Sequence, residues 1–144
     1  MNKKKRSGIL LVTGGVIELI LGTIHFIWPF NFIQLTDFRI LTSPVKDFIL
    51  LAFLSLGLCM TIFAFLSFYF SKRIILEEKS ALIFCLSQGL LWIFRLIFEI
   101  LLPVRVPLFS IKNPSNMIII MAILVILIYL APVFLLNKRI NTVK

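Results

Sequence analysis

Four ionisable side chains lie inside apolar runs long enough to cross a bilayer: Glu18, His25, Arg95 and Glu99. A charged group at the centre of a membrane helix costs about 2.5–3.5 kcal/mol on insertion scales, so such groups commonly serve a function. A buried carboxylate can act as a general base, histidine can exchange a proton near neutral pH, and arginine can bind an anionic group. The helices that carry these four residues determine which of them can act together.

The composition predicts an integral membrane protein made of one domain. Of 144 residues, 60% are hydrophobic and only 15% are charged, whereas a soluble domain carries about 25% charged residues. The net charge of +9 does not indicate nucleic acid as a partner, because the basic residues cluster at the edges of apolar runs and form no basic face interleaved with aromatics. Membrane lipid is the expected surrounding.

Four stretches reach the length of about 20 residues that a spanning helix needs. They cover about residues 8–30, 48–70, 80–102 and 117–136. The sequence therefore predicts an all-α fold, an integral membrane four-helix bundle, with residues 1–144 forming a single four-span transmembrane domain. The first run follows a basic arm as a signal peptide would. It is too long for one and lacks an Ala-x-Ala cleavage site, so we expect a retained helix.

The flanking Lys and Arg residues predict that both termini are cytoplasmic. Ten lie on the side of the termini and four on the other side, and cytoplasmic flanks carry such an excess. Frequent Ile, Phe, Lys and Asn are typical of an AT-rich bacterial genome, which places the protein in the bacterial inner (cytoplasmic) membrane. The ten are Lys3, Lys4, Lys5, Arg6, Lys72, Arg73, Lys79, Lys138, Arg139 and Lys144, and the four are Arg39, Lys46, Arg105 and Lys112.

The first span repeats a small residue every seven positions, at Gly8, Gly15 and Gly22, with Pro29 continuing the row. Glu18 and His25 each follow a glycine by three residues. Positions three, four and seven apart share one face of a helix. Because small residues let membrane helices approach closely, this face is predicted to contact a neighbouring helix.

The third span carries two adjacent rows with the same period. Counted by depth from the cytoplasmic side, Glu18 matches Gln88, and His25 matches Arg95. We therefore expect the stripes of the first and third spans to face each other. Arg95 should pair with Glu18 or Glu99, while His25 and Gln88 complete a hydrogen-bonded network. The two rows are Ala81, Gln88, Arg95 and Leu102, and Cys85, Trp92 and Glu99.

No common catalytic or cofactor motif is present: the chain has no Walker loop, Gly-x-Gly-x-x-Gly, His-Glu-x-x-His or Gly-x-Ser-x-Gly. A zinc site would need three or four ligands, which the spans do not supply, so no metal is predicted and no cofactor is implied. His25 is the single histidine, which leaves only one axial haem ligand or a pair across a homodimer. Cys59 and Cys85 are expected to be small apolar residues, with a redox pair as the other reading.

The segment Gly22-Thr-Ile-His-Phe26, followed by Pro29 and Phe32, resembles the DoxX-like group of small bacterial membrane proteins. In that group a Gly-x-x-His-Phe sequence, then proline and an aromatic residue, closes the first of four helices. The resemblance covers residues 22–32. It implies a four-helix membrane protein associated with redox and quinone-related processes, and His25 is the residue that it carries over.

The leading hypothesis is a polar cavity between the first and third spans that binds an amphipathic or anionic small molecule, such as a lipid, quinone or isoprenoid. Arg95 would supply the positive charge, with Glu18 or Glu99 as its counter-ion, and His25 a hydrogen bond or proton. The predicted ligand-binding residues are Glu18, His25, Gln88, Trp92, Arg95 and Glu99.

Three alternatives use the same residues. In an intramembrane acid–base enzyme, Glu18 or Glu99 would be the catalytic base. In a proton-coupled transporter the relay would run through Glu18, His25, Arg95 and Glu99, although only Leu11 and glycines continue the stripe toward the cytoplasm. In a structural or accessory subunit the charges would lock the bundle, and a homo-oligomer or larger membrane complex would be the partner.

Overall fold

The structure, a computed structural model, describes residues 2–33, 36–104 and 114–140. Within these ranges every long apolar run is helical, as hydrocarbon requires of a backbone that must bond to itself. Four helices are long and apolar enough to cross a membrane, which confirms the all-α four-helix prediction. The helices are α1 (Lys3–Phe32), α2 (Thr36–Arg39), α3 (Ser43–Ile75), α4 (Lys79–Leu101) and α5 (Ser115–Ile140).

The spanning helices cover the predicted apolar runs and mostly extend beyond them. The largest difference is in α3, whose 33 residues make a helix about 50 Å long, against about 30 Å of hydrocarbon. Its first turn contains Pro44, which lies outside the predicted run of about residues 48–70. Proline is tolerated there because the first N–H groups of a helix have no partner within it. Residues 105–113, between the third and fourth predicted runs, lie outside the described residues.

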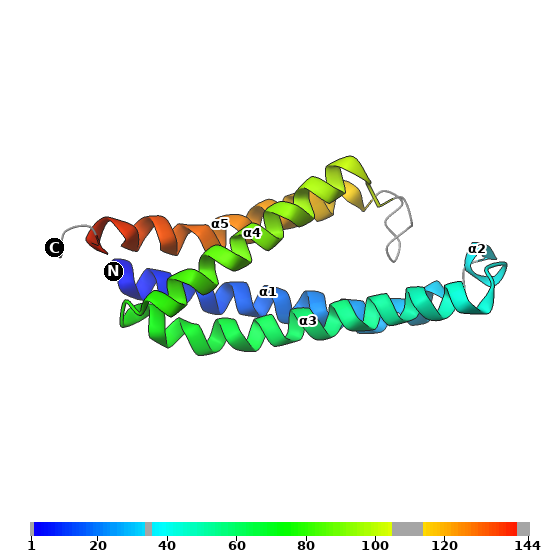
Figure 1. The fold of residues 1–144 in the computed structure, drawn as a ribbon, viewed down its shortest axis with the longest axis horizontal. Coiled ribbons are helices and arrows are strands. Elements are labelled where there is room, and N and C mark those ends of the chain that lie inside the picture. Colours follow the sequence, from blue (N-terminus) through cyan, green and yellow to red (C-terminus); the bar gives the residue numbers. More distant parts are fainter. Residues whose placement is uncertain (1, 34–35, 105–113, 141–144) are drawn as a thin grey trace.

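The four spans form two antiparallel pairs, α1 with α3 and α4 with α5 (Figure 1). The pairs lie together at the end where α1 begins and α5 ends, and they separate toward the end that carries α2. The start of α1 and the end of α5 share one side, as an even number of spans requires. Their cytoplasmic location stays a prediction, and Arg105, Lys112 and Lys144 of its charge count lie outside the described residues.

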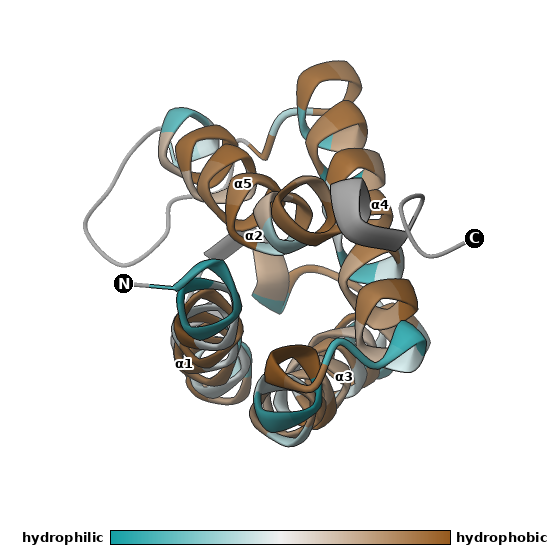
Figure 2. Ribbon diagram, turned by 90° about the vertical axis from the view of Figure 1, so that its left-hand side faces the viewer, coloured by the Kyte–Doolittle hydropathy of each residue, from teal (hydrophilic) through white to brown (hydrophobic). Residues whose placement is uncertain are grey.

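Charged residues gather at the end where the pairs meet, which we call the basic end; the opposite end is the distal end (Figure 2). Lys4 Nζ lies 3.1 Å from Glu77 Oε2, and Arg73 donates to Glu78 Oε2 at 2.8 Å. These pairs join α1 and α3 to the short turn between α3 and α4. Each is partly exposed, so it contributes at most about 1 kcal/mol.

The α1–α3 contact is a seam of small residues in which the two backbones nearly touch. A Cβ atom built on Gly8, Gly15 or Gly22 of α1 would lie 3.0 Å from a carbonyl oxygen of α3. The partners also repeat every seven residues and run in the opposite direction, as an antiparallel pair requires. This small-residue seam pairs Gly8 with Ser71, Gly15 with Ala64 and Gly22 with Gly57.

The seam corrects the prediction that the glycine face of the first span meets the third span. It meets α3 instead, because α3 carries the matching row of Gly57, Ala64 and Ser71, all buried. That row has the same period as the rows of the third span, so the period alone could not select the partner. Close approach requires small residues on both helices, and only α3 offers them along the whole contact.

The apolar core lies mainly in the half of the bundle nearer the basic end. Leu11, Ile74 and Leu136 belong to one fully buried group, and Val125 with Tyr129 to a second group closer to the middle. Toward the distal end the two helix pairs separate (Figure 1). The packed half therefore stabilises the bundle, and the half in which the two helix pairs separate has space for a cavity.

We predict that Gly22→Leu lowers the free energy of unfolding by about 1–3 kcal/mol, the usual cost of overpacking a tight contact. A Cβ at this position would already lie 2.8 Å from Thr61 Oγ1. Thermal unfolding in mild detergent measures the effect. Ile20→Leu, at an exposed position of the same helix, is the matched control, and equal stability of the two variants would contradict the seam.

Candidate functional site

Glu18 is the centre of a buried polar cluster at the middle of the bundle. Its side chain is 1% exposed, and its carboxylate accepts hydrogen bonds from Tyr129 Oη at 2.7 Å, Trp92 Nε1 at 3.2 Å and Ser67 Oγ at 3.5 Å. These donors come from α5, α4 and α3. The one carboxylate of α1 therefore bonds to all three other spanning helices.

The two hydroxyl groups of this cluster lie close together and each has a single proton to donate. Ser67 Oγ and Tyr129 Oη are 2.6 Å apart. Tyr129 donates its proton to Glu18, and the Ser67 proton has three acceptors in reach: Glu18 Oε2, Tyr129 Oη and, at 2.9 Å, the Phe63 carbonyl. Both carboxylate oxygens of Glu18 are engaged by protein donors, an arrangement that suits a structural anchor.

Arg95 pairs with Glu99, one of its two predicted partners, and not with Glu18. Arg95 Nη2 donates to Glu99 Oε2 at 2.7 Å, one helical turn away. Glu99 is fully buried, and its other oxygen accepts the backbone N–H of Val104 at 2.9 Å, just past the end of α4. The carboxylate thus fixes both the guanidinium and the chain leaving the helix.

His25 bonds to its own helix, and this corrects the prediction of a network with Gln88. Its Nδ1 lies 2.7 Å from the carbonyl oxygen of Leu21. A carbonyl can only accept, so Nδ1 carries the proton and Nε2 is the atom that can meet a ligand. The ring lies beside Trp28 and Phe53, with centroids 6.4 Å and 6.2 Å away. The seam rotates this face of α1 toward α3 and away from Gln88.

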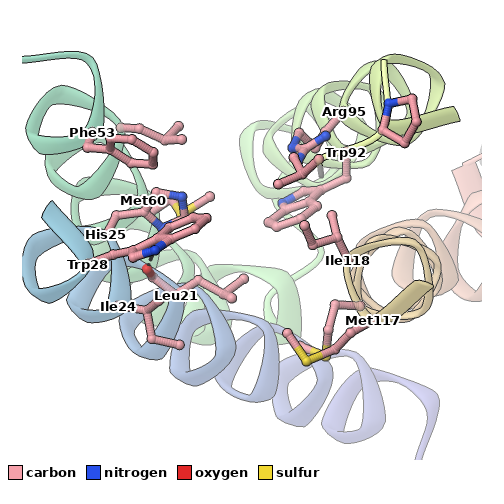
Figure 3. Close-up of a pocket in the computed structure, with 14 residues that line it drawn as sticks. Leu21, Ile24, His25, Trp28, Phe53, Met60, Trp92, Arg95, Met117 and Ile118 are labelled. Carbon is pink, nitrogen blue, oxygen red and sulfur yellow. Dashed lines mark hydrogen bonds between the residues drawn. The ribbon is translucent and has the colours of Figure 1, made fainter. Parts of the chain in front are cut away.

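A cavity of about 490 Å³, the distal cavity, lies where the two helix pairs separate. Figure 3 shows Trp92 and Arg95 of α4 on one wall and His25, Trp28 and Phe53 on the other. Methionines and aliphatic residues of α1, α3 and α5, with Pro103 and Val104, complete the lining. The cavity is therefore apolar apart from an imidazole and a guanidinium.

A smaller cavity of about 190 Å³, the side cavity, lies between α3 and α4. Glu18 and Gln88 line it, and Trp92 and Arg95 line both cavities. Of the six predicted site residues, five therefore border a cavity. Glu99 borders neither of the two and acts on the site through Arg95.

Ser67 and Tyr129, which hold the Glu18 carboxylate, were not among the residues predicted from the sequence. Both lie in the runs of about residues 48–70 and 117–136, which contain no charged residue to mark them. A usable signal was present, because Tyr129 stands well inside an apolar run, whereas membrane tyrosines gather at the interfaces. Such a tyrosine needs a buried partner for its hydroxyl.

Among the described residues no three His, Cys, Asp or Glu side chains come together as metal ligands would. No family model matches this chain. No curated protein and no solved structure matches it either. The function is therefore inferred from the two cavities and the side chains that line them.

We predict that Tyr129→Phe lowers the free energy of unfolding by about 1.5–3 kcal/mol, because the buried carboxylate loses its shortest hydrogen bond. The chain has two tyrosines, and the other, Tyr69, is 53% exposed. Tyr69→Phe is therefore the matched control in thermal unfolding. Equal unfolding temperatures for the two variants would argue against the anchor.

We predict that Arg95→Met lowers the free energy of unfolding by about 3 kcal/mol, because it leaves the buried Glu99 carboxylate without its cation. The double variant Arg95→Met/Glu99→Gln should recover most of this loss, since no charge is then left unpaired. Thermal unfolding of the two single variants and the double variant gives the coupling between them. A double variant less stable than Arg95→Met would show that the pair does not act as a unit.

Proposed function

We propose that this small integral membrane protein binds an amphipathic molecule with an anionic or carbonyl head group in the distal cavity. The observation that supports the proposal is a cavity of about 490 Å³ with an apolar lining and two polar side chains, His25 and Arg95. Small-molecule sites commonly combine apolar walls with a few placed polar groups. Lipids, quinones and isoprenoids have this chemistry.

The head group would bind to Arg95. A guanidinium has five N–H donors in a fixed plane, and the Glu99 carboxylate engages Nη2, so donors are left for an oxygen of the ligand. The Arg95 side chain is 36% exposed, which keeps it accessible from the cavity. His25 Nε2 would bind a second polar atom on the facing wall. An anion or carbonyl would accept hydrogen bonds from Arg95, while His25 Nε2, which carries no proton when Nδ1–H donates to Leu21, would accept one from a hydroxyl or N–H group of the ligand.

The hydrocarbon part would lie against aromatic and methionine side chains. Trp28, Phe53, Met60, Met117 and Met121 line the cavity. Methionine is flexible and polarisable, so it adapts to irregular apolar shapes. Such a lining suits a class of related chains or rings better than one rigid molecule.

The relationship to DoxX-like proteins and the bacterial inner membrane belong to the same proposal. The relationship to DoxX-like proteins is supported by residues 22–32, which include His25. The location in the inner membrane is supported by the composition and by the flanking Lys and Arg residues. A quinone-related ligand would agree with the resemblance. The cavity supports the broader class of amphipathic molecules.

We predict that native mass spectrometry of the protein, purified in mild detergent from its membrane, detects a retained small molecule. Met121→Trp should remove the bound mass, because the added ring fills a cavity that Met121 lines. Ile123→Trp, at an exposed position on the same helix, should retain it.

Two results would contradict this proposal. One is an unliganded wild-type chain; the other is a bound mass that survives Met121→Trp in a folded protein. If the wild type is instead found only with another protein, the charged residues serve an assembly, and the binding function is withdrawn.

A further inference from the structure

Gln88 has a buried polar atom that the protein leaves without a hydrogen bond. The residue is 2% exposed, and no described residue provides a partner for its Oε1 atom. Buried polar atoms nearly always have a partner, which is a protein group, an ordered water or a ligand. Gln88 lines the side cavity, so the partner has a place to sit.

The missing partner is a hydrogen-bond donor without a positive charge. An amide oxygen can only accept, so the partner must donate. Arg95 and Glu18 also line the side cavity. Glu99 pairs with Arg95, and three protein donors engage the Glu18 carboxylate, so no free counter-ion is left there for an ammonium group. The remaining lining is largely apolar, with Leu56, Phe63 and Leu91 among it. A hydroxyl group on a hydrocarbon chain can donate a hydrogen bond, carries no charge and suits an apolar lining.

The side cavity adjoins the distal cavity. Leu56, Met60, Trp92 and Arg95 line both. Gln88 precedes Arg95 by two helical turns, about 10 Å along the axis. A molecule whose head group lies at Arg95 can therefore extend past Trp92 to Gln88.

The side cavity also borders the bilayer. Leu56 and Leu91 of its lining are 42% and 49% exposed, on the sparsely contacting faces of α3 and α4. The end of a hydrocarbon chain can leave the protein there and enter the surrounding lipid. A long-chain ligand therefore needs no room inside the bundle for its full length.

We propose that the side cavity is a second subsite, in which Gln88 accepts a hydrogen bond from a hydroxyl group on the chain of the bound molecule. This inference rests on the proposed function, since the head group must lie at Arg95. It narrows the ligand class to hydroxylated amphipathic molecules. The hydroxyl would stand about two helical turns from the head group.

The test compares stearic acid with 10-hydroxystearic acid, which share a carboxylate and a chain length and differ by one hydroxyl. Both tryptophans of the chain, Trp28 and Trp92, line the distal cavity, so their fluorescence follows binding in detergent. We expect the wild type to bind the hydroxylated acid about five- to tenfold more tightly, as one added hydrogen bond allows.

Gln88→Met keeps the length of the side chain and removes the acceptor. It should abolish the preference and leave the affinity for stearic acid unchanged. Leu86→Met, at an exposed position of α4, should keep the preference. The folded Arg95→Met/Glu99→Gln variant should lose affinity for both acids.

The outcomes separate the two proposals. Equal wild-type affinities for the two acids would overturn the hydroxyl subsite and leave a water as the partner of Gln88, while the head-group site stands. A preference that persists in Gln88→Met would also overturn it. If the wild type binds neither acid, the head-group site itself fails and the subsite fails with it.

Discussion

A carboxylate in the middle of a membrane protein must find hydrogen-bond donors, and Glu18 finds one on every other spanning helix. An unsatisfied polar group in hydrocarbon costs several kcal/mol, so all four helices must lie within hydrogen-bond reach of this point. Apolar packing alone could not bring the four helices together at this point, since lipid tails are as apolar as the helices. The Glu18 cluster therefore sets where the bundle closes, and the distal cavity lies beyond it.

The two halves of the bundle have different structural roles. From the basic end to the middle of the bundle, the small-residue seam, the buried apolar groups and the Glu18 cluster hold the helices together. Toward the distal end the pairs separate, and the polar groups there support one another locally: Glu99 holds Arg95, and Leu21 holds His25. A ligand that enters between the pairs can move these walls without breaking the contacts that define the fold. Such a site can adapt to its ligand at little cost in stability.

Local sequence patterns predicted the number and type of the spanning helices, and failed where a helix had to choose a partner. Span number followed from length and apolarity, and the Arg95–Glu99 pair, one turn apart, was one of two pairings that the spacing left open. The partner of the glycine face did not, because Gly57 and its row on α3 share the seven-residue period of the third span. The Glu18 donors were missed because Ser67 and Tyr129 carry no charge. Their role depends on neighbours that only the folded bundle brings together.

Because the small-residue seam repeats every seven residues, it does not by itself fix the alignment of α3 along α1. If α3 slid along α1 by seven residues, Ala64 would meet Gly22 and Ser71 would meet Gly15, so two of the three pairs would still join small residues. The same slide would carry Ser67 away from Glu18 and bring Ile74 in its place, so the carboxylate would lie against hydrocarbon. A single polar residue that fixes helix register at some cost in stability is known from coiled coils. The contact between Glu18 and Ser67 thus favours the observed alignment of α1 with α3 over the one shifted by seven residues.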